Sequence, residues 1–459
     1  MSSRRLVFVT LALVLTLGAA GGWYLRHTAL APVDADAPVD PLVQQLQALI
    51  VNYRKVIVLL ADEGSLSGTA RVQATHIGQS LFRADQEQQE LVANELGELI
   101  ASGDNGRYQR IEAVLDYVEV DDRLYDGDQL AFREPLLSIQ EALTADGSRP
   151  ARKLNRRVGR DIHALDGIEQ QYNNEFEQLF SRSQNHLAPP VRTKWNLYVS
   201  ELQAVYQRDQ IFKEYGVIMP APAAASAPSP VAAIVPPERP EEKEAHIFGD
   251  KFPPKVIALT FDDGPHPKYT AQIVAILQHY HVPGTFFEIG HNIGTIDASG
   301  RPVLNKNADI TRMLLAKGYT VGNHSYTHPV LSKEKGAQLL AEINNTDLLL
   351  KAIDPNRAPI FRFPYGAHNP EAMAILAQDH LQSVLWNVDS LDWADPIPNS
   401  VADRVLRGVD QVGHGIILFH DIHDRAVKAL PGILDHLIAD GYQFAGWDGQ
   451  GFSVPAGGR

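Results

Sequence analysis

The sequence contains no cysteine among its 459 residues. Disulfides, thiolate zinc sites, iron–sulfur clusters, cysteine nucleophiles and a lipid-modified N-terminal cysteine are therefore excluded. Basic residues are also in deficit, because 41 Lys and Arg face 55 Asp and Glu and leave a formal net charge of −14. Since nucleic-acid binding depends on neutralising phosphates, we expect no nucleic-acid partner. Hydrophobic residues at 44% and charged residues at 21% are typical of a globular chain.

Long hydrophobic runs are scarce, and the clearest one lies near the N-terminus. Arg4 and Arg5 precede an uncharged run over residues 6–25, which as a helix would be long enough to cross a hydrocarbon core of about 30 Å. Two interpretations stay open for residues 1–31: a signal peptide cleaved near Ala31, or an uncleaved signal anchor in the inner membrane. Both predict export to the periplasm or the cell surface.

Residues 32–216 show the three-and-four spacing of hydrophobic residues that is typical of helices. Turn-forming segments, such as Gly103–Gly106 and Pro189-Pro190, separate the periodic stretches. We predict an all-α domain of five or six helices with no catalytic constellation, and a partner in the cell envelope is one candidate role for it. The periodic stretches are 42–60, 77–100, 108–118, 136–143, 158–180 and 191–215.

Residues 217–245 are rich in proline and alanine and end in a run of charged residues. Such a segment cannot build a core, so we predict an extended, semi-rigid linker. It places a domain boundary before residues 246–459.

In residues 246–459, short β-branched runs alternate with helical periods, which implies parallel strands with helices outside them. We therefore predict a distorted (β/α) barrel or strongly curled sheet, preceded by the helical domain. The predicted strands are 256–261, 285–289, 320–322, 360–363, 384–388, 416–419 and 443–445, and the predicted helices are 270–279, 309–317, 333–353, 370–378, 400–409 and 426–440. Gly290–Asn307 is expected to be a long loop.

Polar side chains follow the predicted strands, where parallel β/α folds gather their reactive residues. Asp263, His324 and His328 offer one carboxylate and two imidazoles, which suit a catalytic divalent metal, most plausibly zinc. The His-x-x-x-His pair alone is more often structural. Asp262 lies beside Asp263 on a Gly-Pro turn, so one carboxylate can bind metal while the other accepts a proton from water. The simpler alternative is an Asx turn.

Other strand ends carry candidate supporting residues. His420 ends an apolar strand and is a candidate acid for a leaving group, although a histidine satisfied at a strand edge is the plainer interpretation. We hypothesise that Asp389 keeps His420 charged and that Arg362 pairs with Asp262. Trp393 and Tyr365 offer flat faces that can stack on sugar rings, unless they simply fill the core.

Five segments in this region resemble the NodB-homology polysaccharide deacetylases, carbohydrate esterase family 4, over about residues 255–446. They are Thr260-Phe261-Asp262-Asp263-Gly264-Pro265, His324-Ser325-Tyr326-Thr327-His328, Arg362-Phe363-Pro364-Tyr365-Gly366, Asp389-Ser390-Leu391-Asp392-Trp393 and Leu418-Phe419-His420.

This resemblance implies metal-dependent removal of acetyl groups, usually from N-acetylglucosamine units. It assigns Asp263, His324 and His328 as metal ligands, Asp262 as general base and His420 as general acid. It makes the backbone N–H of Tyr365 an oxyanion donor. It makes Arg362 and Asp389 the residues that tune base and acid, and Trp393 and Leu418 the walls of an acetyl pocket.

The expected function is therefore N-deacetylation of a polysaccharide, either peptidoglycan or an exported, chitin-like glycan. Three alternatives stay open: an O-acetyl esterase on acetylated polysaccharide, an enzyme on non-sugar amides, and a non-catalytic envelope protein that binds glycan.

Overall fold

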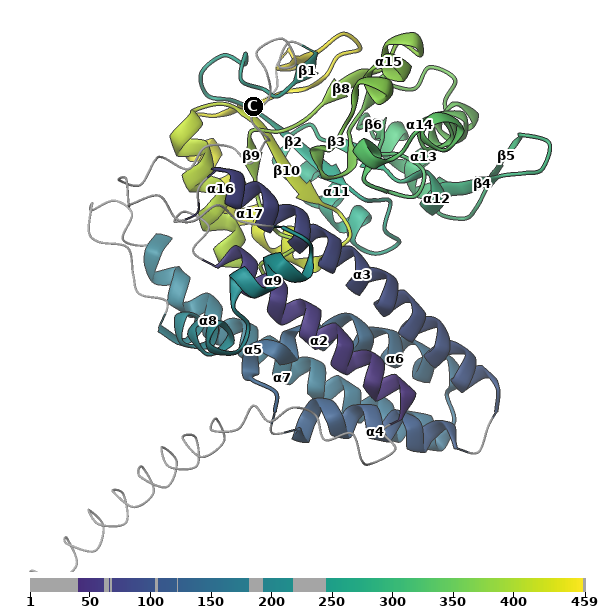
Figure 1. Cartoon of the computed structure of the whole chain (residues 1–459), viewed down its shortest axis with the longest axis vertical. Helices are drawn as coiled ribbons and strands as arrows, with labels where there is room; N and C mark the ends of the chain where they lie inside the picture. The colour runs from purple at the N-terminus through teal and green to yellow at the C-terminus, as the bar shows by residue number, and fades with distance from the viewer. Residues whose placement is uncertain are drawn as a thin grey trace, which may run out of the picture. The chain divides into compact units, whose positions relative to one another are not determined.

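The computed structural model describes residues 40–61, 66, 68–103, 106–121, 123–180, 193–217 and 245–456 (Figure 1). The described residues divide into two compact units. One lies within Met1–Val58, Leu81–Tyr172 and Val191–Ile211, and the other lies within Leu59–Ser80, Asn173–Pro190 and Phe212–Arg459. Among the helices of the described residues, none is both long and apolar enough to cross a membrane. The N-terminal run at residues 6–25 and most of the predicted linker lie outside the described residues.

The region before the predicted linker is helical, as the hydrophobic spacing predicted. Short helices that the periodicity missed also occur, and the last predicted stretch is interrupted by a bend near Tyr206. The helices are α2 (Pro41–Leu60), α3 (Gly68–Ala101), α4 (Arg107–Val120), α5 (Asp126–Gln129), α6 (Arg133–Asp146), α7 (Arg149–Phe180), α8 (Thr193–Val205) and α9 (Arg208–Glu214). Buried leucine, isoleucine and valine side chains of α2, α3, α4, α6 and α7 form the core of the first unit.

A buried ion pair lies in the first unit. The Arg54 guanidinium donates to both carboxylate oxygens of Asp128, at 3.0 and 2.6 Å, and the Tyr198 hydroxyl donates to the same carboxylate at 2.8 Å. A buried charge pair is costly to desolvate unless its remaining hydrogen bonds are satisfied, and here they are. This group has the features of a structural ion pair.

The second unit contains a parallel sheet of nine strands, which confirms the predicted curled β/α architecture. Its order is β1-β8-β7-β6-β3-β2-β10-β9, and β11 also pairs with β2. The strands are β1 (His246–Ile247), β2 (Val256–Asp262), β3 (Thr285–Glu288), β6 (Thr320–Asn323), β7 (Ile360–Phe361), β8 (Gln382–Val384), β9 (Val388–Asp389), β10 (Gly415–His420) and β11 (Gln443–Phe444).

The predicted strand over 384–388 is wrong, because the chain forms two strands there, β8 and β9. Between them it changes partners: the Leu385 N–H donates to the Ile247 carbonyl, and the Asn387 N–H donates to the Ile416 carbonyl. The apolar residues follow one another without a break in the sequence. The sequence therefore does not show that the backbone changes its partner strand within this run.

The helices of this unit, apart from the unpredicted α12, lie near their predicted positions. They are α11 (Tyr269–Tyr280), α12 (Gly290–Ile293), α13 (Ala308–Ala316), α14 (Gly336–Ile353), α15 (Pro370–Gln378), α16 (Pro398–Val412) and α17 (Asp424–Ala439).

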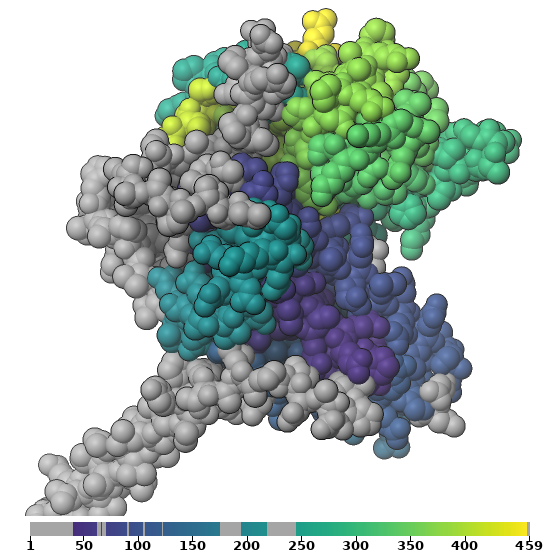
Figure 2. Space-filling view, viewed as in Figure 1, coloured from purple at the N-terminus to yellow at the C-terminus, as the bar shows by residue number. Residues whose placement is uncertain are grey.

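The expected loop at Gly290–Asn307 contains α12 and an antiparallel hairpin, β4 (Gly294–Ile296) with β5 (Pro302–Leu304). Asp297 stabilises the turn of this hairpin through hydrogen bonds to Ser299 and Arg301, and the hairpin projects from the surface of the unit (Figure 2). A second small hairpin, β12 (Gly446–Trp447) with β13 (Phe452–Ser453), follows β11.

The alternation of side chains along β2 and β10 decides what faces the inside of the sheet. Odd-numbered residues of both strands, such as Phe261 and Phe419, pack against α11, α16 and α17. Even-numbered residues, such as Ala258 and Leu418, belong to a separate inner cluster with Trp386. Successive side chains of a strand point to opposite faces. The two strands therefore end with Asp262 and His420 on the inner face.

Candidate active site

Two ionisable side chains meet where the central strands end. Parallel pairing puts His420 of β10 in register with Asp262 of β2. Both are buried, with exposed fractions of 8% and 2%. Because the strands are parallel, their carboxyl ends lie at one edge of the sheet, which is where α/β folds place their ligands.

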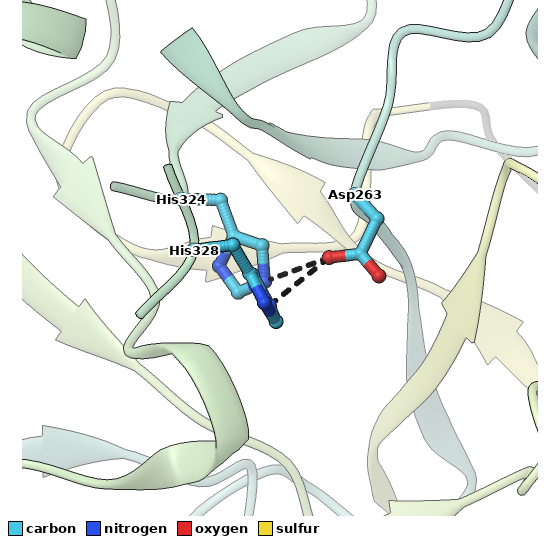
Figure 3. A group of neighbouring side chains, drawn as sticks. All are labelled: Asp263, His324 and His328. Carbon is cyan, nitrogen blue, oxygen red and sulfur yellow. Dashed lines mark ion pairs between the residues drawn. The ribbon is translucent and has the colours of Figure 1, made fainter. Parts of the chain in front are cut away.

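Asp263, His324 and His328 form a cluster beside this pair (Figure 3). His328 Nε2 lies 3.1 Å and His324 Nε2 lies 3.4 Å from one oxygen of Asp263. Asp263 follows β2, and the two histidines lie in the loop after β6. The two imidazoles point toward the same carboxylate oxygen (Figure 3).

The spacing of these ligand atoms fits a divalent metal. Ligand atoms about 2.0–2.1 Å from a tetrahedral zinc lie about 3.4 Å apart, close to the separations of Asp263 from both histidines. The carbonyl oxygen of Arg362 lies 2.8 Å from His324 Nδ1. Nδ1 must therefore carry the proton and donate it, which leaves Nε2 as the ligand atom. Burial by itself would raise the pKa of Asp263. The neighbouring histidines have the larger, opposite effect and hold this pKa well below its usual value.

The backbone that presents Asp263 is held from a neighbouring helix. Asp263 has a φ of 74°, a left-handed conformation that aspartate adopts more readily than most residues. The Asn292 side chain of α12 donates to the carbonyl oxygens of Asp263 and Gly264, at 2.8 and 3.2 Å. No sequence pattern points to Asn292, because it lies in the segment predicted to be a loop.

Arg362 contacts Asp262 directly. Its Nη1 donates to Asp262 Oδ1 and to the Thr260 hydroxyl, both at 2.7 Å. The remaining donors bond the carbonyl oxygens of Val384 and Leu385, and the Phe287 ring lies 4.2 Å from the guanidinium carbon. Burial lowers the pKa of Arg362 even though Asp262 acts in the opposite direction. The guanidinium therefore fixes one oxygen of Asp262, while the other lies 3.5 Å from His324 Nε2.

Asp392, rather than Asp389, contacts His420. Asp392 Oδ1 lies 2.7 Å from His420 Nδ1, and Asp392 Oδ2 accepts the His420 backbone N–H at 2.9 Å. Burial by itself would lower the pKa of His420, but the charge and hydrogen bond of Asp392, together with the charges of Asp263 and Asp262, raise it to about 10. The hypothesis that Asp389 holds His420 is therefore corrected. Both carboxylates belong to Asp-Ser-Leu-Asp-Trp, and spacing alone did not distinguish them.

Asp389 has different contacts. It ends β9 opposite Leu418, and one of its oxygens accepts the Leu391 backbone N–H at 2.9 Å. Loss of solvent raises its pKa to about 6. Its charge acts on Arg362, the partner of Asp262, and also on His420. The charge of Asp389 thus acts on both Arg362 and His420, although Asp389 makes no hydrogen bond to His420.

The remaining predicted residues surround this edge of the sheet. The Tyr365 ring lies 4.7 Å from that of His328, centroid to centroid, and its backbone has a φ of 60°. Trp393 and Leu418 are almost fully buried, with exposed fractions of 2% and 1%. The Arg425 guanidinium donates to the carbonyl oxygens of Asp392 and Trp393 and so supports the turn that carries both side chains.

Part of the chain is similar to known proteins. The family described as polysaccharide deacetylase matches residues 249–384. The peptidoglycan-N-acetylmuramic acid deacetylase PdaC of Bacillus subtilis is 37% identical over 190 residues, 41% of this chain and 37% of that protein. A chitooligosaccharide deacetylase of Bradyrhizobium is 31% identical over 175 residues, 38% of this chain and 74% of that protein. The peptidoglycan-N-acetylglucosamine deacetylase of Bacillus cereus is 29% identical over 211 residues, 44% and 70% of the two chains.

Proposed function

Because the chain belongs to the polysaccharide deacetylase family, we propose that it hydrolyses N-acetyl groups of N-acetylglucosamine-containing polysaccharide and releases acetate. One observation carries the proposal: Asp262 and His420 end neighbouring strands in register, beside the Asp263, His324 and His328 cluster. Relatives named for peptidoglycan and for chitooligosaccharide support a glycan with N-acetylated amino sugars as the substrate. The matched segment spans 37% of the Bacillus subtilis relative, so the activity of the whole chain is part of the proposal.

Asp263, His324 and His328 would hold the divalent cation, and zinc suits their donor set. A cation there supplies Lewis-acid polarisation of the acetyl carbonyl and lowers the pKa of water. All three residues are buried.

Asp262 is proposed as the general base. Arg362 occupies one of its oxygens, and the second oxygen faces the metal cluster, where it can accept a proton from the attacking water. The new bond joins the water oxygen to the acetyl carbon. Charge that develops on the carbonyl oxygen would be met by the backbone N–H of Tyr365.

His420 is proposed as the general acid. Its charged form is stabilised by Asp392, so His420 carries a proton at neutral pH and can give it to the sugar nitrogen as the carbon–nitrogen bond breaks. The products are acetate and a glucosamine unit. Trp393 and Leu418 would form the walls around the acetyl methyl group, and Asp389 would act on the site through Arg362.

Replacing Asp392 with asparagine is expected to move the alkaline limb of the kcat/KM profile to lower pH. The general acid must be protonated, and activity falls as the pH rises through its pKa. Asp392 is the main group among those that raise that pKa to about 10, and an amide removes its charge, so His420 loses its proton at a lower pH. The pH dependence of acetate release between pH 5 and 11 measures the shift. Asp389→Asn is the comparison, since Asp389 makes no hydrogen bond to His420, and an equal or larger shift there would reverse the assignment.

The substrate is tested by measuring acetate released by the metal-loaded full chain. Peptidoglycan, N-acetylglucosamine oligomers and acetylated xylan are compared, and Asp262→Asn serves as the inactive control. We expect release from N-acetylglucosamine substrates at least about tenfold above the control. Release from acetylated xylan alone would replace the proposal with an O-acetyl esterase. Binding of glycan without release from any substrate would replace it with a non-catalytic glycan-binding protein.

We also propose the organisation that the sequence predicted: an export segment at 1–31, a helical domain at 32–216, a linker at 217–245 and the deacetylase domain at 246–459. Relatives named for peptidoglycan support action outside the cytoplasm, where that polymer lies. A linker rich in proline extends by roughly 3 Å per residue, so a tethered catalytic domain would reach a nearby polymer.

A further inference from the structure

The loop that joins the two metal-binding histidines has a backbone that its own residues do not favour. Ser325 has a φ of 64° and His328 a φ of 60°, both in the left-handed region. Residues other than glycine rarely adopt this region, and they keep it only where the surroundings enforce it. Such a loop keeps its shape only if neighbouring elements hold it.

Glu342 of α14 supplies a large part of that support. One of its oxygens accepts the backbone N–H groups of Tyr326 and Thr327, at 3.0 and 2.8 Å. The other accepts the Thr327 hydroxyl at 2.7 Å. The Glu342 side chain is buried, with 8% exposed, and hydrogen bonds to a carboxylate are roughly twice as strong as those between neutral groups.

Other contacts hold the loop from different sides. The Ser325 and Tyr326 carbonyl oxygens accept the N–H groups of Gly290 and His291, at 3.0 and 2.9 Å. Within the loop, the His328 N–H donates to the Ser325 hydroxyl at 3.0 Å. These contacts fix the carbonyl side and the end of the loop. Glu342 fixes the N–H groups in its middle.

We propose that Glu342 is a positioning residue that holds this loop so that His324 and His328 bind the same cation. The proposal rests on the metal site of the proposed function and goes beyond it, because Glu342 lies outside the five motifs and offers no ligand atom to the cluster. Its role is to set the relative placement of two imidazoles whose Nε2 atoms meet one oxygen of Asp263.

Glu342→Gln is expected to weaken zinc binding by about 10- to 100-fold, the range measured when residues that orient metal ligands are replaced. A glutamine of the same size loses the charge and places an amide group against donors. The zinc dissociation constant is measured directly, by competition with a chromophoric chelator. Saturating zinc should restore most of kcat, since Glu342 touches neither substrate nor reacting atoms.

Asp347→Asn is the matched control. Asp347 lies on the same helix, is also buried, and pairs with Lys351 and Arg357 rather than with the histidine loop. Its substitution should lower the thermal stability of the apo protein and leave the zinc dissociation constant within about twofold of the wild-type value.

Thr327→Val is a milder second variant if Glu342→Gln fails to fold, because it removes only the hydroxyl contact to Glu342. It is expected to weaken zinc binding by a few-fold.

Amide exchange gives a readout that does not depend on activity. The amides of Tyr326 and Thr327 should exchange faster in Glu342→Gln than in Asp347→Asn. The proposal is overturned if Glu342→Gln binds zinc as tightly as the wild type, or if both variants lose affinity equally. A wild-type chain that binds no divalent metal would instead overturn the metal site of the proposed function, and with it this role.

Discussion

Replacing Asp262 with asparagine is expected to lower kcat by about 10³-fold, within the range of 10²–10⁴ that general acid–base catalysis supplies. Asparagine has nearly the same shape but cannot accept the proton of the attacking water. The free oxygen of Asp262 faces His324, so the amide leaves the base position filled and inactive. KM should change by less than about threefold if Asp262 acts mainly in the transition state.

A stability measurement must accompany this variant. Asp262 is the carboxylate partner of the buried Arg362, and removing one member of a buried pair costs about 3–5 kcal/mol. Thermal unfolding and zinc content will show whether the protein is folded and loaded. Asp309→Asn, at an exposed carboxylate paired with Arg312, is the control and should retain wild-type turnover. A folded, zinc-loaded Asp262→Asn protein with near wild-type kcat would refute the assignment of the base.

Replacing His328 with alanine is expected to abolish both metal binding and turnover. Lewis-acid stabilisation supplies several kcal/mol, and each 1.4 kcal/mol is tenfold in rate, so we expect a loss of about 10³-fold or more. The remaining pair, Asp263 and His324, offers too few ligands for a tetrahedral site. Metal content after dialysis, together with acetate release, measures both effects.

Chelation and reloading separate loss of metal from loss of fold. The wild type should lose activity with a chelator and regain it with added zinc, whereas His328→Ala should stay inactive at any zinc concentration that leaves the protein soluble. His279→Ala, on an exposed face of α11, should behave as the wild type does. Stoichiometric metal with full activity in His328→Ala would show that the ligand set is wrong.

Local sequence patterns were enough for much of the fold. The β-branched runs predicted the strands β2, β3, β6, β7, β10 and β11. The helical spacing of hydrophobic residues predicted all the longer helices. These elements carry their signal within a few residues: apolar spacing of two or of three and four, interrupted by glycine and proline. The hairpin inside Gly290–Asn307 was missed because its strands are three residues long and half exposed, with no hydrophobic period to find.

The chemical groups of the site could also be identified from the sequence. Asp262, Asp263, His324 and His328 stand out because carboxylates and imidazoles directly follow apolar strands, where a core would not place them. Five motifs in order then implied the family, to which the chain belongs. Which of these groups contact one another was a separate question.

The tertiary structure decided those contacts. Asp389 and Asp392 lie three residues apart, yet only Asp392 reaches His420, because β9 ends at Asp389 and the turn after it crosses the end of β10. Glu342 and Asn292 reach the metal loops from α14 and α12, across sequence separations that no local pattern encodes.

The sequence by itself therefore determined the residue types of the site and their places at strand ends, since both follow from short-range patterning. Only the tertiary structure decided which carboxylate holds which partner. The physical reason is that such pairings depend on sheet order and on the direction of each turn, which arise from packing among residues far apart in the chain.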